Sequence, residues 1–497
     1  MNLAVAKMRE STRGGDTDRM PFPPCHRMSP ILWIAVAALA LAADPAAHAQ
    51  ISPGLKRDLD AAAQKVLTAT GVPGAQMGII RDGRIVYTAA YGKARLEPEL
   101  ATGVAMHFPV GSISKQFTAA CVLLLAEDGK MSLDDPVARW FPELTRAGEV
   151  TVRMLLSHTS GYSDYAPQDY TIPAWTRPVD PLTIVREWAG KPLDFEPGTK
   201  WQYSNTNFVL AALIVQKVSG MPFWQFLETR VLRPLALKDV LNLDTDRDRL
   251  EPRGYMRNAL GPLRPAILEA PGWYFGDGTL AMPVADLLTW DISIIDKKLL
   301  KPASYAAMET EVKLKDGSGS HYGLAVDVRQ RDGHREISHS GEVGGFVAQN
   351  TVYPDDRIAV VVLTNQEASS AASAIARAVE PLLFGGAAGS SVDAADLAAT
   401  ARAKAMLTGL ALGKLDRSVL APDCQAYFSP ETVGDFASSL SPRGAITDFK
   451  QTQKSLRGGM TARGYTVTYA NGRTLFLSTY TMPDGKIEQF LVETPGA

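Results

Sequence analysis

The segment Val110-Gly111-Ser112-Ile113-Ser114-Lys115 precedes an apolar run that continues to Leu124. This pattern predicts the first turn of a helix, where backbone amides have no intrahelical partner. The hydroxyl of Ser112 and its own N–H would lie there at the positive end of the helix dipole, a place suited to a developing oxyanion. Lys115 follows Ser112 by three residues, so the amine and the hydroxyl share one helix face. A partly buried amine can lose its proton near neutral pH and act as a base.

The Ser-x-x-Lys pattern alone is weak, because average residue usage produces it about once in a chain of this length. Its structural alternative is a serine that caps the helix beside a lysine in solvent. The apolar helix directly behind Lys115 favours a buried face and therefore the chemical interpretation.

Two further segments carry polar side chains suited to the same chemistry. In the stretch 201–205 we expect an extended chain, so that Tyr203 and Asn205 project to the same side. A phenol can relay protons there, and an amide can hold a substrate carbonyl. In the stretch 337–342, His339 and Gly341 lie on a predicted edge strand with which a substrate backbone could pair. Each residue alone has a plainer interpretation, a tyrosine packed in the core and a histidine at a strand end.

Together the three segments resemble the serine hydrolases of the class C β-lactamase and D-Ala-D-Ala carboxypeptidase type. That family has Ser-x-x-Lys, Tyr-x-Asn and Lys-x-Gly or His-x-Gly motifs in this order. The phrase Leu155-Leu156-Ser157-His158-Thr159-Ser160-Gly161 also looks like the family, which uses this histidine structurally. The resemblance covers about residues 55–384 and leaves the C-terminal part unexplained.

The resemblance implies a catalytic role for three residues. Ser112 would be the acylated nucleophile, with Lys115 and Tyr203 sharing general-base and general-acid work. The acyl-enzyme would then be hydrolysed by water. No metal and no organic cofactor is implied, and no His-Glu-x-x-His or paired-cysteine pattern offers one.

The resemblance also implies how the substrate would be held. Asn205, His339 and Gly341 would contact the substrate, and the N–H groups of Ser112 and Glu342 would form the oxyanion hole. Many β-lactamases of this family have lysine where this chain has His339, which is neutral for much of the time near pH 7. This departure favours an esterase, an amidase or a D-specific peptidase over an efficient β-lactamase.

The pattern of the chain predicts a mixed α/β (α+β) fold. Short apolar runs joined by turn residues predict strands at both ends of the catalytic part, and the region between them is mostly helical. We therefore expect one antiparallel sheet built from distant segments, flanked by helices and carrying an inserted helical lobe, with a binding cleft between sheet and lobe. The expected strands are 75–81, 84–91, 322–329, 335–339, 346–353 and 357–364, and the closing helix is 371–384.

The remaining chain predicts a second, smaller domain. Residues 385–391 have the small, flexible composition of a linker. Residues 392–497 are expected to form a small α+β accessory domain that begins with a helix over 394–413 and ends with three alternating strands. A lid, an oligomerisation surface and a glycan-binding unit all fit it, and the oligomeric state stays open.

The first 49 residues have the plan of a secretory signal. A basic stretch precedes an apolar run from Ile31 to Ala43, and the small-x-small site Ala47-His48-Ala49 follows. We expect cleavage after Ala49, which predicts an exported protein, periplasmic or secreted. The alternative is a retained anchor, but 13 apolar residues are too few to span about 30 Å of hydrocarbon. No membrane span is therefore expected after removal of residues 1–49, and residues 50–384 would be the hydrolase domain.

Composition limits the partners. Of 497 residues, 46% are hydrophobic and 21% charged, and the formal net charge of −2 offers no basic surface for nucleic acid. A small-molecule or short-peptide substrate fits better. The leading hypothesis is an exported serine hydrolase that cleaves ester, amide or lactam bonds through an acyl-serine intermediate. The alternative is a catalytically silent penicillin-binding-like sensor for cell-wall fragments.

Overall fold

The computed structural model describes residues 51–384 and 397–495. The described residues belong to one compact unit. The predicted signal segment 1–49 and the predicted linker 385–391 lie outside the described residues, so both stay predictions. In the described part of the chain, no helix combines the length and the apolar character needed to cross a membrane.

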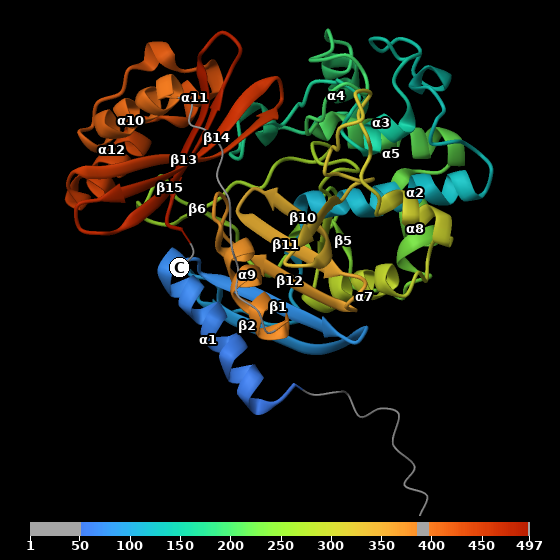
Figure 1. Ribbon diagram of the computed structural model, residues 1–497, viewed down its shortest axis with the longest axis horizontal. Helices are drawn as coiled ribbons and strands as arrows, with labels where there is room; N and C mark the ends of the chain where they lie inside the picture. The colour runs from blue at the N-terminus through green and yellow to red at the C-terminus, as the bar shows by residue number, and fades with distance from the viewer. Residues whose placement is uncertain (1–50, 385–396, 496–497) are drawn as a thin grey trace, which may run out of the picture. The chain divides into compact units, whose positions relative to one another are not determined.

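A seven-stranded antiparallel sheet forms the centre of the catalytic part (Figure 1). Its strand order is β3-β2-β1-β12-β11-β10-β9, so strands from the two ends of this part pair where β1 meets β12. The Asp82-Gly83 turn joins β1 to β2, and Gly83 has a φ of 71°, as such a tight hairpin requires. The strands are β1 (Gly74–Arg81), β2 (Arg84–Arg95), β3 (Leu100–Ala101), β9 (Asp327–Arg331), β10 (His334–Val343), β11 (Phe346–Tyr353) and β12 (Ile358–Thr364).

Helices cover both faces of this sheet, because alternate residues of its central strands are apolar on each side. Met77 and Val360 pack with α1 (Pro53–Thr70) and α9 (Ala371–Phe384) on one face. Val361 and Leu363 belong to the larger core on the other face, which the helical lobe covers. The lobe contains α2 (Ser114–Glu127), α3 (Val152–Leu156), α4 (Pro181–Trp188), α5 (Asn205–Ser219), α6 (Phe223–Leu227), α7 (Val284–Ile295) and α8 (Pro302–Met308).

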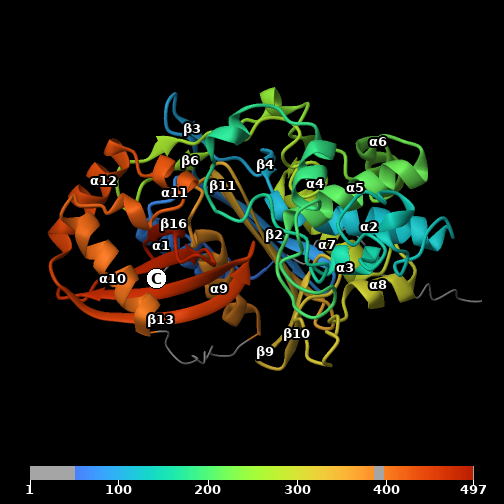
Figure 2. The same ribbon diagram turned by 90° about the horizontal axis from the view of Figure 1, so that it is seen from above.

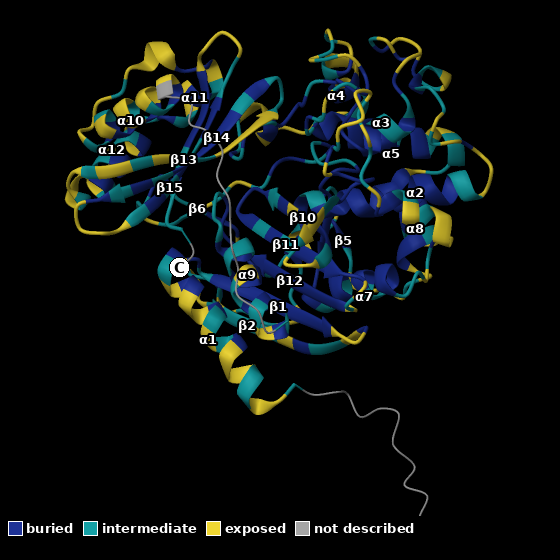
Figure 3. Ribbon diagram, viewed as in Figure 1, coloured by how far each residue is buried: buried dark blue, intermediate teal, exposed yellow. Residues whose placement is uncertain are grey.

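Helix α2 is the most enclosed element of the lobe. Every residue from Ser114 to Leu125 is buried, including Lys115, and the helix is dark blue along most of its length in Figure 3. A short 3-10 turn, η1 (Gly111–Ile113), precedes it and carries Ser112. The sequence therefore puts the Ser-x-x-Lys pattern into the core rather than on a solvated helix.

A second, four-stranded antiparallel sheet lies in the C-terminal part, with strand order β13-β14-β15-β16. Apolar residues such as Tyr465, Leu477 and Phe490 form a separate core with the neighbouring helices, which pack on one face of this sheet (Figure 2). The elements are α10 (Leu397–Ala411), α11 (Pro422–Tyr427), α12 (Pro430–Leu440), β13 (Ile446–Arg457), β14 (Met460–Tyr469), β15 (Thr474–Thr481) and β16 (Ile487–Glu493). The predicted division of the chain into domains stays a prediction.

The structure departs from the expected elements in three places. The strand expected over 322–329 begins only at Asp327, because Ala325 has a φ of 65° and the chain turns there. The extended stretch expected over 201–205 ends one residue early, since Asn205 is the first residue of α5. Strand β13 was not predicted, because its residues are mostly polar and exposed and do not alternate.

Candidate active site

Ser112 and Lys115 are in direct contact. The ammonium nitrogen Nζ of Lys115 lies 2.8 Å from Oγ of Ser112, as the spacing of three residues predicts. The same Nζ donates to Oδ1 of Asn205 at 2.7 Å and to the backbone oxygen of Asp277 at 3.0 Å. The oxygens of Asn205 and Asp277 thus hold the amine beside the oxygen of Ser112.

The surroundings of Lys115 favour loss of its proton. Its side chain has no exposed surface, and burial lowers its pKa to about 8. The carboxylates of Asp277 and Asp164 oppose this shift, and Arg457 adds to it. An amine with a pKa near 8 is partly neutral at physiological pH and can accept a proton from the hydroxyl of Ser112.

Asn205 supports the lysine. Its Oδ1 accepts from Lys115, while its Nδ2 donates to Oδ2 of Asp164 at 3.3 Å and to the backbone oxygen of Ala166 at 3.1 Å. Its backbone N–H donates to Oδ1 of Asp164. The amide of Asn205 is thus fully engaged within the protein, and the expected contact with a substrate carbonyl stays a prediction.

The ring of Tyr203 lies beside the lysine. The Nζ of Lys115 is 5.1 Å from the centre of the Tyr203 ring. The centres of the His158 and Tyr203 rings are 4.2 Å apart. Burial raises the pKa of the Tyr203 phenol, while its interaction with Ser112 lowers that pKa by less. Nδ1 of His158 accepts from the N–H of Ser204, and burial holds the pKa of this histidine well below its usual value. His158 is therefore a neutral residue that packs against Tyr203.

His339 is a neutral residue of the cavity wall. Its Nδ1 hydrogen-bonds to the backbone oxygen of Ser340, and its Nε2 lies 2.8 Å from the hydroxyl of Tyr322. The carbonyl must accept from Nδ1, so Nε2 accepts from the phenol. Burial, with the charge of Lys115, lowers the pKa of His339 to about 4.

The second half of β10 lies against the turn that carries Ser112. The pairing of β10 with β9 ends at Ser338, so residues 339–343 continue alone on that side. A Cβ at Gly341 would lie 1.9 Å from the oxygen of Val110 and 3.0 Å from the nitrogen of Ser112. A Cβ at Gly111, whose φ is 51°, would lie 2.5 Å from the nitrogen of Glu342. Glycine at both positions allows this close approach of the two backbones.

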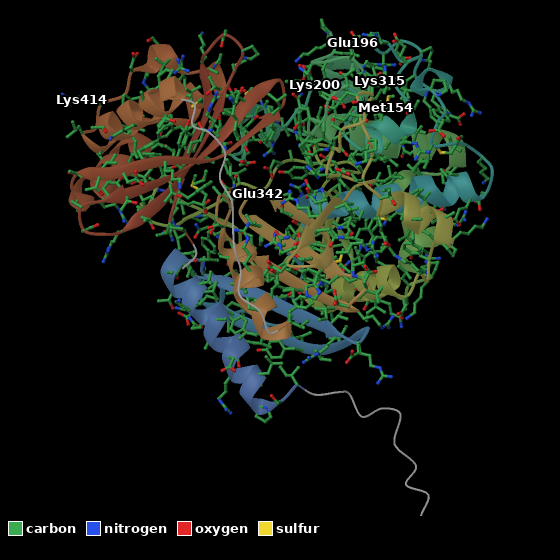
Figure 4. All side chains as sticks on the ribbon, in the orientation of Figure 1. Met154, Glu196, Lys200, Lys315, Glu342 and Lys414 are labelled. Carbon is green, nitrogen blue, oxygen red and sulfur yellow. The ribbon has the colours of Figure 1, made fainter. Side chains whose placement is uncertain are left out.

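A cavity of about 670 Å³ opens beside these residues. Its wall includes Ser112, Tyr203, Asn205, His339 and Glu342, whose side chain lies near the middle of the view in Figure 4. Residues of the C-terminal sheet also line this cavity: Arg457, Ala462, Gly464, Phe476, Ser478, Tyr480 and Leu491.

Several residues of the site had not been predicted. Asp164 and Asp277 surround Lys115, Tyr322 binds His339, and Arg457 approaches Tyr203. Gly276 and Gly278 flank Asp277. This pattern indicates a carboxylate in a tight turn, but the sequence does not show which residue the carboxylate faces. In the described ranges, no group of three or more His, Cys, Asp or Glu side chains is arranged to hold a metal ion.

Comparison with known proteins identifies the family of the catalytic part. The family model described as Beta-lactamase matches residues 59–384. The chain belongs to the beta-lactamase family. "Penicillin-binding protein 4*" of Bacillus subtilis is 30% identical over 322 residues, covering 61% of this chain and 70% of that protein. A "D-aminopeptidase" of Brucella suis is 26% identical over 312 residues, covering 61% of this chain and 58% of the aminopeptidase.

Solved structures of similar proteins agree with the β-lactamase-like fold. A D-stereospecific amidohydrolase from Streptomyces sp. has a TM-score of 0.56 and 29% identity, covering 66% of this chain and 99% of that one. An octameric penicillin-binding protein homologue from Pyrococcus abyssi has a TM-score of 0.60 at 22% identity, covering 88% and 99% respectively. The predicted family, mixed α/β fold class and hydrolase class are confirmed.

Proposed function

We propose that this beta-lactamase-family hydrolase cleaves amide or ester bonds of small D-configured substrates through an acyl-enzyme on Ser112. The observation that carries the proposal is the distance of 2.8 Å between Nζ of Lys115 and Oγ of Ser112, in an environment that lowers the pKa of the amine to about 8. A buried, partly neutral amine in contact with a hydroxyl is the arrangement that an activated serine needs.

In the proposed acylation, the hydroxyl oxygen of Ser112 attacks the substrate carbonyl and its proton passes to Lys115. The N–H groups of Ser112 and Glu342 donate to the oxyanion, for which the close approach of Gly111 and Gly341 is favourable. The proton then passes to the leaving amine or alcohol, directly or through the phenol of Tyr203, which burial keeps protonated. Water attacks the ester of Ser112, and the free acid leaves.

The substrate class rests on two observations. Relatives are named D-aminopeptidase and D-stereospecific amidohydrolase, which supports amide hydrolysis at D-configured residues. His339 is neutral, with its pKa lowered to about 4, so it offers no permanent cation to the carboxylate of a β-lactam. Export, with a periplasmic or secreted location, is part of the proposal and rests on the composition of residues 1–49.

A fluorophosphonate probe and a hydrolysis panel test the proposal together. We expect the probe to label Ser112, and we expect hydrolysis of nitrophenyl esters and of D-amino-acid amides, with slower turnover of the L-enantiomers. The Ser112→Ala variant is the control for both measurements. A folded protein that shows no adduct on Ser112 and no hydrolysis would instead support the silent sensor.

A further inference from the structure

The turn between β13 and β14 reaches into the active site. Arg457 is the last residue of β13, and its backbone forms a parallel bridge with that of Tyr203. Gly458 and Gly459 follow with positive φ values of 53° and 74°. A Cβ at Gly458 would lie 2.6 Å from Cβ of Pro167, so glycine is needed for this turn to lie so close to the catalytic part.

The side chain of Arg457 is held in one orientation. Its Nη1 donates to Oδ1 of Asp169 at 2.7 Å and to the hydroxyl of Tyr480 at 2.9 Å. Tyr480 and Gln489 also donate to Oδ2 of Asp169. The guanidinium carbon lies 5.8 Å from the centre of the Tyr203 ring, within the range of a cation–π contact. A planar group with so many fixed contacts keeps its charge in one place.

The charges that face the catalytic pair come from several elements. The two cations near the Tyr203 ring are Lys115 and Arg457. The facing titratable groups are Asp164, Asp169, Asp277, Glu342, His158, His339, Tyr322 and Tyr480. Both histidines have lowered pKa values and are neutral, so neither supplies positive charge.

We propose that Arg457 is a positioning residue through which the C-terminal sheet completes the active site: its guanidinium, fixed beside the Tyr203 ring that Lys115 also contacts, supplies positive charge that favours the neutral form of the base, Lys115. This proposal rests on the proposed function of Ser112, because it concerns the base that activates that serine. The charge of Arg457 acts in the direction required, since it lowers the pKa of Lys115 and that of Tyr203. Both residues lie in a buried site, where a nearby charge is poorly screened.

A purely structural role for Arg457 gives a different expectation. If its bonds to Asp169 and Tyr480 only tied the C-terminal sheet to the catalytic part, its loss would lower stability or maximal rate and leave the pH dependence unchanged. The pH dependence of Ser112 labelling separates the two roles. This readout also needs no knowledge of the natural substrate.

The experiment measures the rate of fluorophosphonate labelling of Ser112 between pH 5.5 and 10 in the full chain. We expect Arg457→Met to move the midpoint of the rise to higher pH by about 0.5–1.5 units, because a lost cation makes the protonated amine more favourable. Arg457→Lys keeps the charge but loses the planar group that Asp169 and Tyr480 hold, so it should shift the midpoint less than Arg457→Met does. Arg473→Met is the matched control, because it removes an exposed arginine beside β15 of the same sheet.

Each outcome decides one of the two proposals. Wild-type protein that is not labelled at any pH overturns the proposed function, and this inference with it. Labelled wild type with an unmoved midpoint in Arg457→Met overturns the inference alone, and so does an equal shift in Arg473→Met. If Arg457→Met does not fold, Asp169→Asn replaces it. This variant leaves the charge of Arg457 uncompensated, so the midpoint of Ser112 labelling must fall to lower pH. An unchanged or raised midpoint refutes the inference.

Discussion

The pair of Lys115 and Asp277 gives the sharpest test of the proposed base. Asp277 is buried, and its Oδ2 lies 3.9 Å from Nζ of Lys115 and accepts from the hydroxyl of Tyr165 at 3.0 Å. Burial raises the pKa of Asp277 to about 7, against the opposing charge of Lys115, so the carboxylate is mostly ionised in the range where Lys115 titrates. Asp277→Asn removes this charge and nearly preserves the shape.

The size of the effect follows from the distance. Two unit charges 3.9 Å apart interact by about 4 kcal/mol at an effective dielectric constant of about 20, which corresponds to about 3 pH units. Opposite charges at such distances shift measured pKa values by about 1–3 units. Loss of the carboxylate disfavours the protonated amine, so the pKa of Lys115 should fall from about 8 to between about 5 and 7.

The assay is kcat/KM for a chromogenic ester from pH 5 to 9.5, with spontaneous hydrolysis subtracted. The acidic limb of this pH profile reports the pKa of the base in the free enzyme. The variant's acidic limb should therefore lie at lower pH than that of the parent, with its midpoint between about 5 and 7. Asp291→Asn is the control, since Asp291 is a buried carboxylate that hydrogen-bonds to Asn350 instead of Lys115. An acidic limb of Asp277→Asn that stays in place or moves to higher pH would refute Lys115 as the base.

Three further predictions concern neighbouring residues. Ser112→Ala should abolish the covalent adduct, seen by intact mass, and lower kcat/KM by at least about 10³-fold. Gly341→Ala should lower the free energy of unfolding by about 1–3 kcal/mol and slow labelling of Ser112, because its Cβ would lie 1.9 Å from the oxygen of Val110; parental values in thermal unfolding and labelling would contradict this. Because His339 is neutral, ester turnover should exceed nitrocefin turnover, and equal or faster nitrocefin rates would exclude that reasoning.

The contact between Ser112 and Lys115 could be predicted from the sequence because helical spacing fixes it locally. Tyr203 and His339 could be predicted only as motifs of a family, since nothing local says that they approach Ser112. The structure brings both to the same cavity. The charges that set the pKa of Lys115 could not be predicted from the sequence, because Asp164, Asp277 and Arg457 come close to this amine only through tertiary packing.

Strand β13 shows why the C-terminal contribution could not be found in the sequence. Only Gln451 among its residues is buried, and its polar side chains do not alternate with apolar ones. An edge strand can have this composition because one of its neighbours is solvent. The Gly458-Gly459 pair indicates a turn, yet no sequence rule says that this turn packs on Pro167 beside the active site.

The neutral state of His339 and the position of Arg457 have one electrostatic explanation. A second ammonium at position 339 would lie in a buried site next to Lys115, with Tyr322 as its hydrogen-bonded neighbour. Such a charge is costly without a carboxylate partner. Arg457 has that partner in Asp169, at 2.7 Å. The site can therefore keep positive charge against Tyr203 from the C-terminal side, while His339 leaves its own side of the cavity uncharged.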